Sequence, residues 1–99
     1  MKRVLLRTHD LVFRSKLGSV ITDAGAEVSR DEATCDLAVI ELGDPDAIGR
    51  IAALVSHGIP VLAYGAHVRA ELLRAARDAG AVAVPNSQVE ARLRALLTS

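Results

Sequence analysis

The chain has little that would point to a chemical activity or to a nucleic-acid partner. Aromatic residues make up 2% of its 99 residues, and Lys+Arg 12 balance Asp+Glu 12, which excludes a globally basic surface with aromatic stacking positions. Its one cysteine excludes an internal disulfide and a cysteine-built zinc site, as is typical of a reducing compartment. Neither a signal-peptide core nor an apolar run of membrane-spanning length is present. We therefore expect residues 1–99 to form one complete cytoplasmic domain that binds neither nucleic acid nor a membrane.

Short apolar runs instead alternate with stretches of helical spacing along the chain. Hydrophobic residues make up 51% of the sequence, and this alternation is typical of a parallel sheet covered by helices on both faces. The expected strands are 3–7, 26–28, 37–42, 60–64 and 81–84. Apolar positions at helical spacing predict helices near 13–24, 48–55, 68–79 and 89–97.

Two local features refine this pattern. Asp10 and Asp44 precede helical stretches, and Pro45 follows the second of them, so both aspartates are expected to cap helix N-termini. The connection 29–36 is too short for an ordinary crossover helix, and at most one turn fits. One face of the sheet is therefore expected to be incompletely covered beside the second strand.

Four phrases of the sequence resemble the receiver domain of bacterial two-component response regulators. They are "RVLLRTHDLVFRSKLGSVITDAGAEV", "DLAVIELGDPD", "IPVLAYGAHV" and "AGAVAVPNSQVEARLRALL", which together span nearly the whole chain. The second phrase is the most specific, with an apolar run, an acidic residue and then a Gly/Pro-containing loop. The resemblance implies an α/β, flavodoxin-like, doubly wound sheet of five parallel strands in the order 2-1-3-4-5. In this chain the crossover helix after the second strand is expected to be missing or reduced to one turn.

The residues that give receivers their phosphotransfer chemistry are largely replaced. In receivers an acidic pair and the acceptor aspartate hold Mg²⁺, while a hydroxyl and a lysine bind the phosphoryl oxygens. The acidic pair aligns here with Thr8 and His9, although Asp10 is adjacent, and the hydroxyl position holds Gly65. No lysine occurs after Lys16. We therefore expect a degenerate receiver that has no catalytic residue and needs no cofactor.

Glu41 aligns with the phospho-accepting aspartate and has two interpretations. Its carboxylate could stand in permanently for the acyl phosphate and hold the domain in one signalling state. It could equally be a solvent-facing carboxylate at a strand end, where a charge needs no functional explanation.

The sequence therefore predicts a stand-alone, non-enzymatic receiver-like module of signalling and protein interaction that acts without phosphorylation. The alternative is a small-molecule or metal-ion binding domain that uses Asp10, Glu41, His9 and His67 at the carboxyl ends of the strands. No close ligand pair supports a metal, so none is expected.

Two surfaces could bind the unknown protein partner, and a second copy of the chain is one candidate. The resemblance implies the helices after the fourth and fifth strands, although arginine-bearing helices are often ordinary solvated surfaces. The incompletely covered face beside the second strand is the other surface. The residues concerned are Arg69, Arg74, Arg77 and Arg92 on the helices and Val28 and Cys35 beside the gap.

Overall fold

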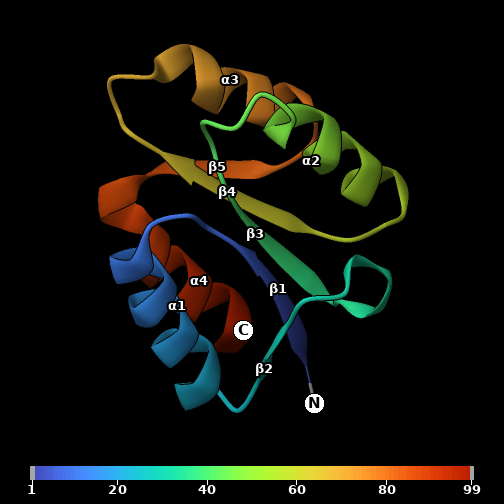
Figure 1. The fold of residues 1–99 in the computed structure, drawn as a ribbon, viewed down its shortest axis with the longest axis vertical. Helices are drawn as coiled ribbons and strands as arrows, with labels where there is room; N and C mark the ends of the chain where they lie inside the picture. The colour runs from blue at the N-terminus through green and yellow to red at the C-terminus, as the bar shows by residue number, and fades with distance from the viewer. Residues whose placement is uncertain (1, 99) are drawn as a thin grey trace.

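Five parallel strands form one sheet in the order β2-β1-β3-β4-β5 in the computed structural model, which describes residues 2–98 (Figure 1). Every pair of neighbouring strands is parallel, and the predicted strand order is confirmed. The short apolar runs form these strands because a parallel strand that is covered on both faces needs apolar side chains on both sides. The strands are β1 (Arg3–Arg7), β2 (Glu27–Ser29), β3 (Leu37–Glu41), β4 (Val61–Gly65) and β5 (Val82–Pro85).

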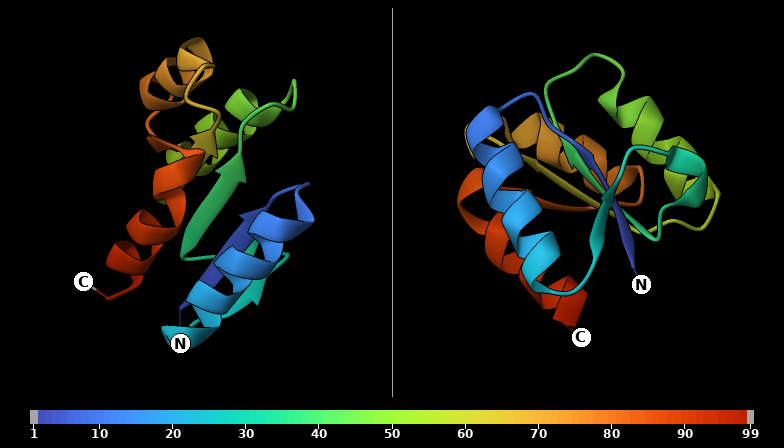
Figure 2. Two further views of the ribbon diagram at one scale, coloured as in Figure 1. Left: turned by 90° about the vertical axis from the view of Figure 1, so that its left-hand side faces the viewer. Right: turned by 60° about the horizontal axis from the view of Figure 1, so that its bottom comes forward.

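Four α-helices cover the sheet in two layers. The helices are α1 (Leu11–Asp23), α2 (Ala47–Ser56), α3 (Ala70–Asp78) and α4 (Val89–Thr98). Figure 2 shows α1 and α4 side by side on one face, while α2 and α3 lie on the other. Because side chains alternate along a strand, Val4, Val39 and Leu62 pack under α1 and α4, whereas Leu5 and Ile40 pack under α2.

The two predicted aspartate caps have different outcomes. Asp10 caps α1 as expected, because its Oδ1 accepts hydrogen bonds from the backbone N–H groups of Val12 at 2.8 Å and Phe13 at 3.3 Å. The prediction for Asp44 is wrong. The helix begins later, at Ala47, and the Asp44 carboxylate is bound to a histidine side chain instead.

Gly80 allows α3 to end close against α2. It has φ +103°, in the left-handed region, and a Cβ at this position would lie 2.8 Å from Cγ1 of Val55. Only glycine satisfies both conditions, since the backbone turns sharply where there is no room for a side chain.

The connection between β2 and β3 contains one 3₁₀ turn, η1 (Glu32–Thr34), so the predicted loss of the crossover helix is confirmed. The side chains at the uncovered edge are charged. Arg3 pairs with Glu27 at 2.9 Å, and Arg7 pairs with Glu32 at 3.0 Å. The exposed positions of β1 on this face are arginines, so the surface left open beside the gap is charged and not apolar.

The two residues proposed beside this gap lie in different environments. Cys35 is 8% exposed and packs in the core under α2, so its placement on an interaction surface is wrong. Burial also raises the pKa of its thiol. Val28, on the edge strand β2, is 45% exposed.

Candidate functional site at the carboxyl ends of β1, β3 and β4

Three polar side chains meet where three neighbouring parallel strands end. Thr8 follows β1, Glu41 ends β3 and Tyr64 lies near the end of β4. The Tyr64 hydroxyl donates to Thr8 Oγ1 at 2.6 Å, and Thr8 Oγ1 donates to Glu41 Oε1 at 2.8 Å. A short relay of hydrogen bonds therefore joins the three strands at one edge of the sheet.

The Tyr64 and Thr8 side chains of this relay are shielded from solvent. Tyr64 is fully buried and Thr8 is 3% exposed, while the Phe13 ring lies with its centroid 5.1 Å from that of Tyr64. Burial disfavours the phenolate and raises the pKa of Tyr64 to about 12. Tyr64 is therefore a neutral donor at physiological pH, and its hydroxyl fixes the orientation of Thr8.

Glu41 is half-buried, and one of its carboxylate oxygens accepts two hydrogen bonds. Oε1 accepts the Thr8 hydroxyl and also the backbone N–H of His9, the latter at 2.6 Å. Glu41 therefore ties the end of β3 to the loop that leads into α1, which does not fit the interpretation of a freely solvated carboxylate.

The same loop makes a second connection at the surface. His9 Nε2 lies 2.6 Å from Asp44 Oδ2, which joins the β1–α1 loop to the β3–α2 loop. The hydrogen bond and negative charge of Asp44 raise the pKa of His9. The His9 side chain is largely exposed, so its contact with Asp44 joins the two loops at the surface and is not part of the core.

The structure brings together some of the predicted site residues and separates others. Thr8, His9 and Glu41 are joined, whereas the Asp10 side chain turns back to cap α1. Gly65 packs beside Leu42, and a Cβ at Gly65 would lie 3.3 Å from the Leu42 Cβ, which leaves little room for a hydroxyl-bearing residue.

The ligand set of the alternative function is not assembled. His67 is exposed in the loop between β4 and α3. Within residues 2–98, no three His, Cys, Asp or Glu side chains are grouped so that they could hold a metal ion. Over the same residues, no helix combines the length and apolar character needed to cross a membrane.

The arginines of α3 and α4 differ in how they are bound. Arg69 pairs with Glu71 at 2.7 Å, and Arg77 donates to the Ala83 carbonyl at 2.8 Å. Arg74 and Arg92 are exposed and make no ion pair or hydrogen bond within the described part of the chain.

Sequence reasoning missed Tyr64 and the partners of Glu32. A tyrosine inside the buried run "VLAYG" was a usable signal, because a buried hydroxyl requires a hydrogen-bond partner. Glu32 gave no such signal, since it reaches Arg50 and Arg7, which are 18 and 25 residues away in the chain.

Comparison with known proteins gives matches only at the level of structure. No protein-family model and no curated protein sequence matches the chain. The receiver domain of the Francisella response regulator 1452 is 17% identical, with a TM-score of 0.75 over 98% of this chain and 93% of that one. A CheY-like protein (tadZ) from Pseudomonas aeruginosa PAO1 is 20% identical, with a TM-score of 0.76 over 98% and 97%. The BeF3-activated DrrB receiver domain is 14% identical, with a TM-score of 0.79 over 98% and 94%. At such identities the likeness concerns the fold.

Proposed function

We propose that this chain, which has the fold of a response regulator receiver domain, is a non-catalytic signalling module that binds a protein without being phosphorylated. The observation that carries the proposal is the engagement of Glu41. Its Oε1 accepts both the Thr8 hydroxyl and the His9 N–H, so the carboxylate at the acceptor position is bound internally.

The surrounding residues support the same conclusion. Phosphoryl transfer of the receiver type needs a carboxylate cluster for Mg²⁺ and positive charge for the phosphoryl oxygens. Thr8 and His9, which the resemblance aligns with the acidic pair, carry no carboxylate, and the Asp10 carboxylate is used in capping α1. The strand β5 ends with Val84 and Pro85, which offer no amino group.

Incubation with a small acyl-phosphate donor and Mg²⁺, followed by intact-mass spectrometry, tests this proposal. We expect no mass increase in the native chain. Glu41→Asp alone should not restore uptake, because acceptor, metal carboxylates, hydroxyl and lysine act together and one repair leaves the transition-state charge unmatched. One added phosphate that disappears in Glu41→Gln would contradict the proposal.

The partner surface that we propose is the side of the molecule formed by α3, β5 and α4. Arg74 and Arg92 are unpaired there within residues 2–98, and Val82 of the edge strand β5 is 41% exposed. A partner that neutralises these arginines and covers Val82 would gain both charge-assisted and apolar contacts. A second copy of the chain is the simplest partner to test.

Light scattering across a range of salt concentrations distinguishes the two surfaces. If the chain dimerises through α3, β5 and α4, added salt and Arg74→Glu should each lower the molar mass towards that of a monomer. Val28→Asp, on the opposite edge of the sheet, is the matched control and should leave the mass unchanged. A dimer broken by Val28→Asp alone would move the interface to β2.

A further inference from the structure

A cleft of about 500 Å³ lies at the carboxyl ends of β1 and β3, on the side covered by α2. Leu5 and Ile40 of these strands lie at its apolar floor. The helices that follow β1 and β3 pack on opposite faces of the sheet, so the cleft lies where the direction of winding reverses. Crevices at this point of open parallel sheets are general ligand sites.

Arginines are the distinctive residues of the cleft wall. They come from four separate segments and are Arg7, Arg14, Arg30 and Arg50. Arg14 Nη2 donates to the Thr8 carbonyl at 2.8 Å, so this side chain is already held. Arg30 makes no ion pair or hydrogen bond with any described residue.

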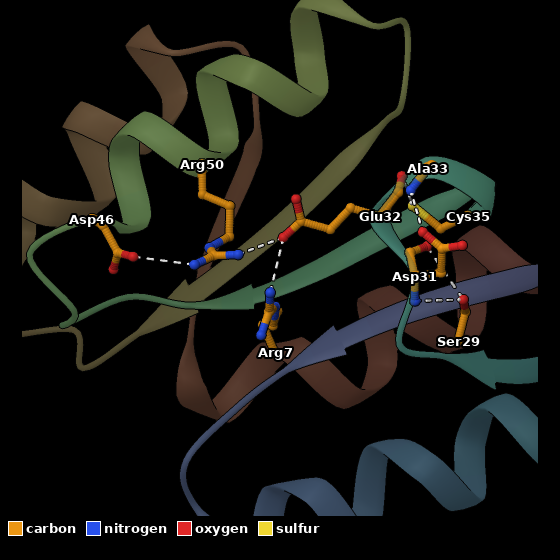
Figure 3. Close-up of polar contacts among 8 residues, drawn as sticks. All are labelled: Arg7, Ser29, Asp31, Glu32, Ala33, Cys35, Asp46 and Arg50. Carbon is orange, nitrogen blue, oxygen red and sulfur yellow. Dashed lines mark hydrogen bonds and ion pairs between the residues drawn. The ribbon is translucent and has the colours of Figure 1, made fainter.

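Glu32 behaves as an internal anion between two of these arginines. Its Oε1 accepts from Arg7 Nη2 at 3.0 Å and also from Arg50 Nη1, while its second oxygen binds nothing in residues 2–98 (Figure 3). Arg50 also donates to Asp46 Oδ2 at 3.1 Å. The two guanidinium groups thus converge on one oxyanion position, and they lower the pKa of Glu32.

We propose that this cleft binds a small molecule bearing a phosphate group, which replaces the Glu32 carboxylate between Arg7 and Arg50. A phosphate carries up to two negative charges and three terminal oxygens, so it can engage both guanidinium groups and Arg30 together. The volume also suits a ligand of mononucleotide size, because pockets for such molecules span about 300–1,000 Å³.

The acidic residues of the same wall do not occupy the position proposed for the phosphate. Glu41 is bound by Thr8 and the His9 N–H, and Asp44 is bound by His9. Asp46 remains paired with Arg50 and offsets part of its charge. Binding is therefore expected to be moderate and to weaken with added salt. The ligand is held without covalent change, so this proposal is independent of the absence of phosphorylation.

Titration of the ¹⁵N-labelled chain with inorganic phosphate and, separately, with adenosine monophosphate provides the test. Shifts should concentrate at the side chains of Arg7, Arg30 and Arg50. Arg7→Gln and Arg50→Gln should each weaken binding about tenfold or more, as expected for a lost hydrogen bond to a charged group. Lys16→Gln, an exposed cation of α1 outside the cleft, is the matched control and should bind as the native chain does.

Glu32→Gln is the most discriminating variant, because we expect it to strengthen phosphate binding whereas Arg7→Gln and Arg50→Gln weaken it. It removes the competing carboxylate while keeping the size of the side chain, so phosphate should bind several-fold more tightly. Thermal melts of each variant with and without about 50-fold excess ligand should show a larger ligand-induced rise in melting temperature for Glu32→Gln.

The outcomes separate the sources of the phosphate group as well. Tighter binding of adenosine monophosphate than of inorganic phosphate supports a phosphorylated metabolite, and equal binding supports recognition of the phosphate group alone. Absence of shifts at Arg7 and Arg50, weaker binding by Glu32→Gln, or an equal loss in Lys16→Gln would overturn the proposal. These experiments measure reversible ligand binding, whereas the test of phosphorylation measures a covalent mass increase, so failure of one proposal is distinguishable from failure of the other.

Discussion

The two faces of the sheet are stabilised differently. Under α1 and α4 the strands are apolar from Val4 to Val84, and the polar residue buried beside them, Thr8, is fully hydrogen-bonded. Under α2 and α3 the apolar core reaches only as far as Leu5. Beyond Leu5, towards β2, the cover consists of ion pairs centred on Arg3 and Arg7.

This difference shows how the fold accommodates the loss of a helix. A strand face without a covering helix must either find other cover or become polar. Here Glu32 of η1 accepts a hydrogen bond from Arg50 of α2, and the exposed positions of β1 on this face are arginines. Charged side chains at such an edge also discourage pairing with other chains. Substitutions on the two faces test this contrast between an apolar face and a face held by charge.

Leu17→Ala should have the largest effect, because it opens a cavity in the apolar face. Leu17 is fully buried in α1, and truncation of such a side chain costs about 2–5 kcal/mol of unfolding free energy. Urea denaturation measures the loss. Leu11→Ala is the matched control in the same helix, since Leu11 is 76% exposed and should change stability little. Equal losses in the two variants would contradict the assigned packing of α1.

The sequence was sufficient for the fold because its signals there are local. Runs such as Leu37–Glu41 and the helical spacing of Leu17, Val20 and Ile21 each report burial without knowledge of distant residues. The short 29–36 connection likewise predicted the missing helix by length alone.

The candidate site was only partly predictable because its contacts are not local. Alignment with receivers placed Thr8, His9 and Glu41 near one another, but spacing gave no indication that Asp44 would bind His9 in preference to capping α2. Long, flexible charged side chains such as Arg50 can reach several partners, and only the three-dimensional arrangement selects among them.

Tyr64→Phe should have the next largest effect, because it removes the donor to Thr8 in the dry part of the apolar face. The expected loss is roughly 1 kcal/mol near neutral pH, as is typical of one intramolecular hydrogen bond. Equilibrium unfolding in urea gives this value. No loss would indicate that the relay from Tyr64 to Glu41 does not hold the strand ends together.

The same residue gives the native chain a dependence on alkaline pH. The pKa of Tyr64 is raised to about 12 in the folded protein, above its unfolded value near 10. Its contribution is therefore fully present below pH 10 and is lost as the pH rises towards 12. Tyr64→Phe should lack this part of the decline, and the difference between the two pH profiles isolates it.

Glu32→Gln should have a smaller effect, because it acts on the face held by charge. The pKa of Glu32 is lowered by Arg7 and Arg50, so the stabilisation is present above the unfolded pKa and is lost as the pH falls through the folded value. Half-exposed ion pairs contribute at most about 1 kcal/mol, and added salt should reduce even this difference. A loss comparable to that of Leu17→Ala would mean that the two faces do not differ as described.

The contact between His9 and Asp44 should contribute least to stability, since its side chains lie largely in solvent at the edge between the two regions. Its clearest signature is the titration of His9. The Asp44 hydrogen bond and charge raise the pKa of His9 above 6.5, so the pair stabilises the fold at pH values below 6.5 and loses this effect as the pH rises through the folded pKa.

Asp44→Asn should return the pKa of His9 towards its ordinary value, because it removes the negative charge while keeping a similar shape. Proton NMR of the imidazole resonances follows this change directly, and high salt should produce a smaller shift in the same direction. An unchanged pKa in Asp44→Asn would show that the two loops are not joined by this contact in solution.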